Sequence, residues 1–482
     1  MIHDAISRLP AHAIADAVAS RQISARNVLL DHLDAIERLN PQINAICTLA
    51  AEQALAEADA LDSRLAAGTK PGPLAGVPVA IKDIVPTAGI RTTFGSRLLA
   101  DFVPEQDAVI VERLRRADAI VLGKTNVPEF AAGANTKNAL FGATRNPWDL
   151  SLTAGGSTGG GAAALASGMV ALADGSDLGG SIRTPAAFCG VFGLRPTPGL
   201  VPIWPTERPW DTLAVAGPMA RNLADLALML SVIAGPLAES PLNAPAGRDF
   251  PAAIDAAKTR GLRIAWCADP VGIGIDRNIE ARGRDVAALL GKSGAVVDEI
   301  DPDLSQAAEI FFALRAYGMV ATHLARLDRL DQVDSKIAAN VRAGLDQAPA
   351  TLAAAERDRA LFRARMLAFF EAHDILLCPA TAILPFDVAL DYPTVVNGRP
   401  MVNYVGWLAP TFPATLAGLP ALAVPCGTTP QGIPVGLQVI ARPHHEEQAL
   451  TVGAAIEQAF PFAFPPLRTA IRAASYEEHH GH

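Results

Sequence analysis

The sequence predicts an α/β fold, and two observations support that class. Half of the 482 residues are hydrophobic and 18% are charged, which suits a large buried interior and argues against a disordered chain. Short β-branched segments at residues 76–85 and 119–127 flank an amphipathic segment at 107–117, and this order of strand, helix and strand is typical of an α/β core. A chain of this length has room for roughly two to four domains or for one large core.

The start of the chain has the spacing of helices. Apolar residues recur at helical intervals in residues 14–39 and 50–65, and Ser24 and Asn40 are placed to start and stop a helix. We therefore expect residues 1–70 to form a helical layer that packs on the α/β core.

The rest of the chain alternates between the two patterns. Residues 236–260 are rich in Pro, Ala and Asp and predict a surface excursion, and residues 471–482 predict a flexible tail whose three histidines could bind a metal adventitiously. Further strands are expected at 261–269, 374–383 and 420–427, and further helices at 162–169, 223–233, 280–293, 303–330, 350–372 and 447–460.

The composition argues against several classes of function. The net charge is -9 and no basic run is present, so a nucleic-acid partner is not expected. The five cysteines lie far apart and form no CxxC pair, which indicates reduced thiols and no structural zinc. The first 20 residues lack the basic end and apolar core of a signal peptide, and no segment reaches about 18 uninterrupted apolar residues. We expect a cytoplasmic protein that does not bind membranes.

Two serines in glycine-rich segments, Ser157 and Ser181, concentrate the candidate chemistry between residues 153 and 198. Glycines let backbone N–H groups turn toward one point, while a hydroxyl in the same loop supplies a nucleophile or a proton relay. For the segment GGSTGGG, a flexible linker remains an alternative. A phosphate loop is disfavoured because the segment does not end in GK[ST].

The second glycine-rich segment, GSDLGGSIRTP, strengthens the case. Residues 178–181 offer consecutive N–H groups beside a hydroxyl, which is how an oxyanion hole is built next to a nucleophile. A tight structural turn is the alternative for Ser181. Asp177 and Arg183 flank the segment with opposite charge, and we expect them to form an ion pair that pins the loop rather than to act in catalysis.

A serine hydroxyl is a weak nucleophile at neutral pH and needs a base. The ten histidines are terminal, in a polar turn or isolated in helical segments, and they form no HExxH-type cluster, which disfavours a metal hydrolase. Lys82 is a better candidate for the base because it interrupts the apolar run 77–85, and burial favours a neutral amine. An exposed lysine paired with an acid is the alternative for Lys82, and Lys124 is a rival that looks less buried.

Three segments together resemble the amidase signature family. They are VAIKD at 79–83, GGSTGG at 155–160 and GSDLGGSIRTPA at 175–186. The spacings of 75 residues from Lys82 to Ser157 and 24 from Ser157 to Ser181 agree with the family pattern. Further similarity extends over about residues 70–460, in GKTNVPEFA, RNPWD, FGLRPTPG, AGPMAR, GLPALAVPCG and GIPVGLQVI. The family includes fatty acid amide hydrolases, glutamyl amidotransferase A subunits, aryl acylamidases and indoleacetamide hydrolases.

The resemblance implies a fold and a catalytic triad. The fold would be a single domain over residues 71–470, built on a large twisted mixed β-sheet with helices on both faces. Ser181 would be the nucleophile, Ser157 a bridging serine that follows a cis peptide bond eased by Gly156, and Lys82 the base. The resemblance also implies an oxyanion hole formed by the N–H groups of Leu178, Gly179, Gly180 and Ser181.

The resemblance also implies an activity. The protein would hydrolyse a carboxylic amide to an acid and an amine or ammonia through a serine acyl-enzyme, without a metal or cofactor. We expect a standalone enzyme, with a homodimer as the candidate assembly, acting on a small aryl or aliphatic amide, with carbamates and esters as further candidates. The alternatives are a glutamine-hydrolysing A subunit of a tRNA amidotransferase complex and a catalytically silent binding protein.

Two departures from the family pattern lie beside Ser157. Thr158 stands where many members have a second serine, so a supporting hydroxyl is retained and a methyl group is added; Gly161 replaces a larger or polar residue and is expected to widen the pocket. An apolar or aromatic acyl group is the preferred substrate. Candidate pocket residues, with membership of the core as the alternative for each, are Phe130, Asn135, Phe141, Ile203, Trp204, Trp210, Tyr317, Tyr404 and Trp407.

Overall fold

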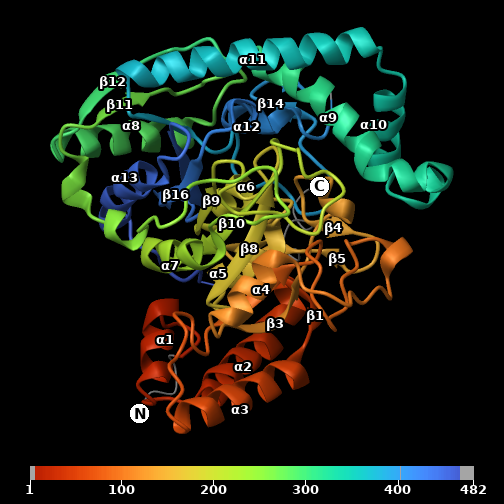
Figure 1. Ribbon diagram of the computed structural model, residues 1–482. Helices are drawn as coiled ribbons and strands as arrows, with labels where there is room; N and C mark the ends of the chain where they lie inside the picture. Colours follow the sequence, from red (N-terminus) through yellow and green to blue (C-terminus); the bar gives the residue numbers. More distant parts are fainter. Residues whose placement is uncertain (1–5, 402, 467–482) are drawn as a thin grey trace, which may run out of the picture.

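An 11-stranded mixed sheet forms the centre of the protein, which is described by a computed structural model over residues 6–401 and 403–466 (Figure 1). The predicted tail at 471–482 lies outside these residues. The sheet confirms the predicted α/β class. Its strands, in spatial order, are β1 (Ile46–Leu49), β3 (Ile120–Thr125), β2 (Pro78–Lys82), β8 (Leu172–Asp177), β10 (Val215–Ala220), β9 (Phe192–Arg195), β16 (Ala421–Thr428), β17 (Pro434–Ala441), β13 (Ile375–Pro379), β11 (Arg263–Trp266) and β12 (Val296–Glu299).

Helices surround this sheet, and Figure 1 shows α1, α2 and α3 at one end of the molecule and α9, α10 and α11 at the other. Among the described residues, no helix has the length and apolar character needed to cross a membrane. The helices are α1 (Ala11–Ala19), α2 (Ala25–Ile43), α3 (Ala51–Ala66), α4 (Val109–Arg116), α5 (Gly159–Ala166), α6 (Arg183–Cys189), α7 (Leu223–Ile233), α8 (Arg277–Lys292), α9 (Ala307–His323), α10 (Ser335–Leu345), α11 (Pro349–Ala372), α12 (Phe412–Ala417) and α13 (Glu446–Ala459).

Three neighbouring parallel strands, β3, β2 and β8, are buried along almost their whole length, as expected for strands covered on both faces. Helix α5 packs against all three and consists only of glycine, alanine and leucine. Small side chains are needed there, because a Cβ on Gly160 would lie 2.4 Å from the backbone nitrogen of Asn126. The carboxyl ends of parallel strands lie at one edge of a sheet, where ligands commonly bind.

The N-terminal segment differs from the predicted helical layer in two respects. The predicted helix at 14–39 is two helices separated by a turn at residues 20–24. Ser24 does start the second helix, because its side chain accepts a hydrogen bond from the Asn27 N–H. Residues 1–70 are not purely helical, since they also contribute strand β1 to the edge of the central sheet.

The predicted helix stop at Asn40 is wrong. Helix α2 continues to Ile43 and ends at Asn44, which adopts the left-handed conformation with a φ of 58°. The Asn40 side chain instead accepts the N–H groups of Ala45 and Ile46 at 2.8 and 2.9 Å. Asn40 therefore joins the end of the helix to the start of strand β1.

Most other predicted elements appear, with three main differences. The strands predicted in 76–85 and 119–127 are β2 and β3, and α7 has the predicted bounds. The helix predicted at 303–330 ends at His323 and continues as a 3-10 segment, and α10 was not predicted. Strands β8, β9, β10, β12 and β17 were also not predicted.

Candidate active site

Lys82 is the last residue of β2, and its side chain is fully buried. The ammonium nitrogen Nζ lies 2.8 Å from each of three hydroxyl oxygens, those of Ser157, Thr158 and Ser176. Within the described part of the chain, no carboxylate lies within 4 Å of Nζ. Burial lowers the pKa of Lys82 to about 7, against the opposing effect of two more distant aspartates. A large fraction of Lys82 is therefore a neutral amine near pH 7.

The second buried lysine, Lys124, has a different role. It is as buried as Lys82, contrary to the prediction that it would be less so. Its Nζ donates to the Val85 carbonyl and, at 2.7 Å, to Thr87 Oγ1, so it holds the loop that follows β2. Of the two lysines, only Lys82 contacts Ser157.

Ser157 lies in the loop that leads into helix α5, and it is almost fully buried. The peptide bond between Gly156 and Ser157 is cis, as the resemblance implied. A Cβ on Gly156 would lie 2.9 Å from the backbone of Ala134, so no larger residue fits there without movement of that backbone. The loop of Ser157 and the loop of Ser181 are joined where the Thr158 N–H donates to the Ser181 carbonyl at 3.1 Å.

A proton relay from Ser181 through Ser157 to Lys82 needs two hydrogen bonds, and this structure has only the one between Lys82 and Ser157. Lys82 and Ser157 are hydrogen bonded, but no hydrogen bond joins Ser181 Oγ to Ser157 or to Lys82 among the described residues. Ser181 is partly exposed, whereas Ser157 is not. The nucleophile candidate is thus partly accessible to solvent, whereas the candidate base is fully buried.

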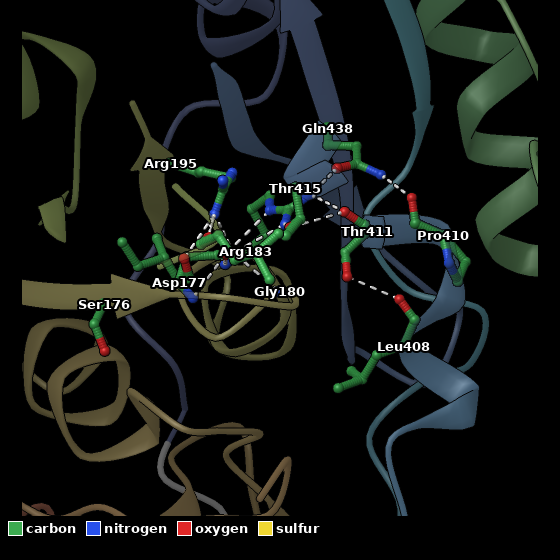
Figure 2. Close-up of polar contacts among 12 residues, drawn as sticks. Ser176, Asp177, Gly180, Arg183, Arg195, Leu408, Pro410, Thr411, Thr415 and Gln438 are labelled. Atoms are coloured by element: carbon green, nitrogen blue, oxygen red, sulfur yellow. Dashed lines mark hydrogen bonds and ion pairs between the residues drawn. The ribbon is translucent and has the colours of Figure 1, made fainter. Parts of the chain in front are cut away.

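Asp177 organises the loop that carries Ser181 (Figure 2). Its Oδ1 accepts the Gly180 N–H at 3.0 Å, and its Oδ2 accepts the Ile182 N–H at 3.1 Å. It also forms the predicted ion pair with Arg183, at 2.9 Å. Burial acts to raise the pKa of Asp177, but Arg183 and Arg195 outweigh it and hold that pKa well below its usual range. Asp177 is therefore ionised at neutral pH.

Arg183 connects this loop to the other side of the site. Its Nη1 donates to the Thr411 carbonyl at 2.9 Å and to Gln438 Oε1 at 2.8 Å, and Gln438 in turn donates to the Pro410 carbonyl (Figure 2). The guanidinium is fully buried, so these partners replace the water that a buried cation would otherwise need. Through its ion pair with Asp177, Arg183 therefore ties the loop of Ser181 to Thr411 and Gln438.

The four backbone N–H groups of residues 178–181 do not have the same environment. The Gly180 N–H is engaged by Asp177, whereas those of Leu178, Gly179 and Ser181 have no protein acceptor among the described residues. Gly180 has a φ of 98°, and a Cβ there would lie 2.8 Å from Thr411 Cγ2. Among the described residues, three of these four N–H groups are therefore without a protein acceptor.

Thr158 lies close to Gly161, so a side chain at position 161 would meet its methyl group. A Cβ at Gly161 would lie 3.2 Å from the Thr158 methyl carbon Cγ2, and a Cβ at Gly175 would lie at the same distance from it. Gly161 is itself buried. The methyl group that Thr158 adds to the site occupies the space beside these two glycines.

The candidate pocket residues fall into two groups. The first group is buried and contacts other core residues. In this group Trp407 stacks on Phe188, and the Tyr404 hydroxyl accepts a hydrogen bond from Arg315. The side-chain amide of Asn135 donates to backbone carbonyl groups. The others are partly or largely exposed. Of these, Phe130 packs against His323, Phe141 lies under Arg91, and Ile203, Trp204, Trp210 and Tyr317 lie at the surface.

The side chains that abut the Ser181 loop were not found from the sequence. A Cβ on Gly179 would lie 2.7 Å from the ring of Phe311 and 3.4 Å from that of Phe412. These two rings stack at a centroid distance of 3.8 Å. Thr411 lies beside them and contacts Gly180. They come from α9 and the start of α12, so no local sequence signal links them to the loop.

No group of three or more histidine, cysteine, aspartate or glutamate side chains is placed to hold a metal ion among the described residues. All five cysteines are free thiols, four of them buried. The chemistry available in the described site is that of hydroxyl groups, one buried amine and oriented backbone N–H groups.

Comparisons with known proteins give the family. The family model described as Amidase matches residues 27–450. The A subunit of the glutamyl-tRNA(Gln) amidotransferase of Moorella thermoacetica is 38% identical, over 93% of this chain and 96% of its own. Among solved structures, a bacterial aryl acylamidase of the amidase signature family has a TM-score of 0.89 at 29% identity, covering 94% of this chain and 96% of its own. The A subunit from Thermotoga maritima has a TM-score of 0.76 at 27% identity, covering 96% and 99%. This chain therefore belongs to the amidase signature family of enzymes that hydrolyse C–N bonds.

Proposed function

We propose that the protein hydrolyses a carboxylic amide through an acyl-enzyme on Ser181, with Ser157 as the proton relay and Lys82 as the base. One observation carries this proposal: a buried lysine, with a pKa of about 7, donates to the hydroxyl of Ser157 at 2.8 Å, and among the described residues no carboxylate lies within 4 Å of its Nζ. A general base works best when its pKa lies near the working pH.

The relay first moves a proton from Ser181 toward Lys82 and then returns it to the substrate. Neutral Lys82 accepts the proton of Ser157, which accepts that of Ser181 as Ser181 Oγ attacks the carbonyl carbon. The relay then runs in reverse and protonates the leaving nitrogen as the C–N bond breaks. Water attacks the acyl-enzyme by the same route. Ser181 must come within hydrogen-bond distance of Ser157 when substrate binds, since catalytic hydrogen bonds often tighten only in the substrate complex.

We assign the oxyanion hole to the N–H groups of Leu178, Gly179 and Ser181. The developing negative charge on the carbonyl oxygen needs donors that are already oriented, and each is worth about 3 kcal/mol in such sites. Gly180 has a different part: its N–H binds Asp177 and thereby keeps the loop in the shape that exposes the other three.

The test is to purify the chain alone and measure hydrolysis of a panel of aryl, aliphatic and carbamate amides together with glutamine. We expect Ser181→Ala to abolish turnover and Ser157→Ala to reduce it strongly. Ser167→Ala is the matched control, because Ser167 caps the far end of α5 and only bonds carbonyls of its own helix; its activity should equal that of the wild type. Unchanged turnover in Ser181→Ala would overturn the mechanism.

A second candidate is the glutamine-hydrolysing A subunit of an amidotransferase complex. The sequence similarity to curated A subunits, 38% over 93% of the chain, supports this candidate better than it supports a standalone hydrolase of small aryl or aliphatic amides. The higher TM-score of the aryl acylamidase, 0.89 against 0.76, supports the standalone enzyme. The substrate panel separates them: an A subunit would prefer glutamine and would purify with companion proteins, whereas a standalone enzyme would turn over neutral amides alone.

A further inference from the structure

A buried aspartate on the strand next to Lys82 has no part in the mechanism described so far. Asp174 lies in β8 and is fully buried. Its Oδ1 accepts the backbone N–H of Lys82 at 2.6 Å. Its Oδ2 has no hydrogen-bond partner among the described residues. A buried carboxylate that is only half satisfied is costly, so its presence beside the candidate base needs a reason.

Few charged groups lie near Lys82, and they differ in whether they have an ion-pair partner. Asp177 is already paired with Arg183 and Arg195. The side chains in contact with Lys82 Nζ are neutral hydroxyls, and helix α5 carries no charge. Lys124 lies on β3, on the other side of β2, and no ion pair joins it to Asp174 within 4 Å. Asp174 is therefore the one aspartate acting on Lys82 that has no arginine partner in the described residues.

We propose that Asp174 is a positioning residue for Lys82, which fixes the end of β2 through the Lys82 N–H and sets, through its negative charge, the pH at which Lys82 loses its proton. This inference rests on the proposed function. Burial alone would make Lys82 a weak base, because it removes the water that stabilises the ammonium. The negative charge of Asp174 offsets part of that effect and keeps the amine basic enough to take a proton from serine.

The sign of the effect follows from the charge. Asp174 as an anion favours the ammonium form, so its removal lowers the pKa of Lys82. Burial holds the pKa of Asp174 itself above its usual value, and the bond from the Lys82 N–H and the charges of Lys124 and Lys82 offset only part of that rise. Replacing the Asp174 carboxylate by a neutral group should therefore extend activity toward acid pH.

The experiment measures kcat/KM against pH with a chromogenic aryl amide such as p-nitroacetanilide, or with glutamine if that is the better substrate. In Asp174→Asn, which keeps an oxygen for the Lys82 N–H and loses the charge, the acidic limb should move to lower pH by on the order of one unit, the size expected when a buried amine loses one nearby opposite charge. Asp174→Glu keeps the charge, so its limb should stay at the wild-type pH although kcat falls.

The matched control is Asp83→Asn, at an equally buried aspartate that bonds Thr93 and does not act on Lys82; its limb should not move. An unshifted limb in folded Asp174→Asn would overturn the proposal. Asp174→Ser provides the same comparison if Asp174→Asn does not fold. Loss of folding in both neutral variants but not in Asp174→Glu would assign the carboxylate to the fold and also overturn it. Failure of the proposed function itself is distinguished by wild-type turnover that survives Ser181→Ala.

Discussion

Replacing Lys82 with methionine should give an inactive protein that is no less stable at pH 7. Methionine matches the length of the lysine side chain and fits a buried site without an amine. General-base catalysis contributes about 100- to 10,000-fold, so kcat/KM should fall by at least that factor. The effect on the free energy of unfolding has two opposing parts, because burial of the amine destabilises the fold whereas its hydrogen bonds stabilise it.

The cost comes from the pKa of Lys82, which is about 7 in the fold against its usual 10.5. The unfolded chain therefore binds a proton that the folded chain does not, between these two pH values, and stability rises with pH across that window. At pH 7 the cost is on the order of 4 kcal/mol. Methionine removes it but leaves three hydroxyls, those of Ser157, Thr158 and Ser176, without their lysine partner, at about 1 kcal/mol each. The two effects nearly cancel at pH 7.

The assay is thermal unfolding of wild type and Lys82→Met at several pH values, together with kinetics on the best substrate of the panel. The melting temperature of Lys82→Met should equal or exceed that of the wild type at pH 7 and fall below it by pH 9 to 10. Lys124→Met is the matched control and should retain activity, because Lys124 contacts neither serine. More than a tenth of wild-type activity in Lys82→Met, or a difference in melting temperature that does not change with pH, would refute the reasoning.

Three further predictions concern the packing of the site and the N-terminal helix. Thr158→Val keeps the shape but loses the hydroxyl at 2.8 Å from Lys82, so kcat should fall about tenfold with little change in melting temperature, whereas Thr158→Ser should keep most activity. Gly161→Ala places a methyl 3.2 Å from Thr158 Cγ2 and should lower the melting temperature of the protein. The decrease should be smaller in a Thr158→Ser background, which lacks that methyl carbon. Equal decreases in both backgrounds would contradict this contact. His12 bonds Asp225 at 2.7 Å, which raises the pKa of the imidazole; its stabilising effect is present below about pH 6.5 and is lost as pH rises through the folded pKa, so His12→Ala should lower the melting temperature more at pH 5.5 than at pH 8.5.

Much of the site could be predicted from sequence because its signals are local. Ser157, Thr158 and residues 178–181 lie in glycine-rich loops, and glycine reports positions where backbones approach closely. Lys82 could be singled out because a charge in an apolar run is unusual. Its direct contact with Ser157 could not be deduced from either segment alone, because it depends on how β2 packs against α5.

The remaining features depend on contacts between distant parts of the chain. Strand β8 contains Gly, Ser and two Asp and lacks the pattern of a strand, but it is held between β2 and β10, with six registered pairs to the latter. Phe311 and Phe412 reach Gly179 from more than a hundred residues away. The assignment of Trp407 and Tyr404 to a pocket is not supported because each side chain is committed to core partners. Aromatic composition alone does not distinguish a core ring from a binding surface.

The central claim is that Ser181 is the nucleophile and depends on Lys82 through Ser157. The most direct test is to react the protein with a fluorophosphonate, which captures activated serines, and to locate the adduct by peptide mass spectrometry. The account predicts one adduct, on Ser181, formed at least 100-fold more slowly in Lys82→Met and absent in Ser181→Ala. An adduct on Ser157, or labelling of Ser181 at the same rate in Lys82→Met, would contradict it.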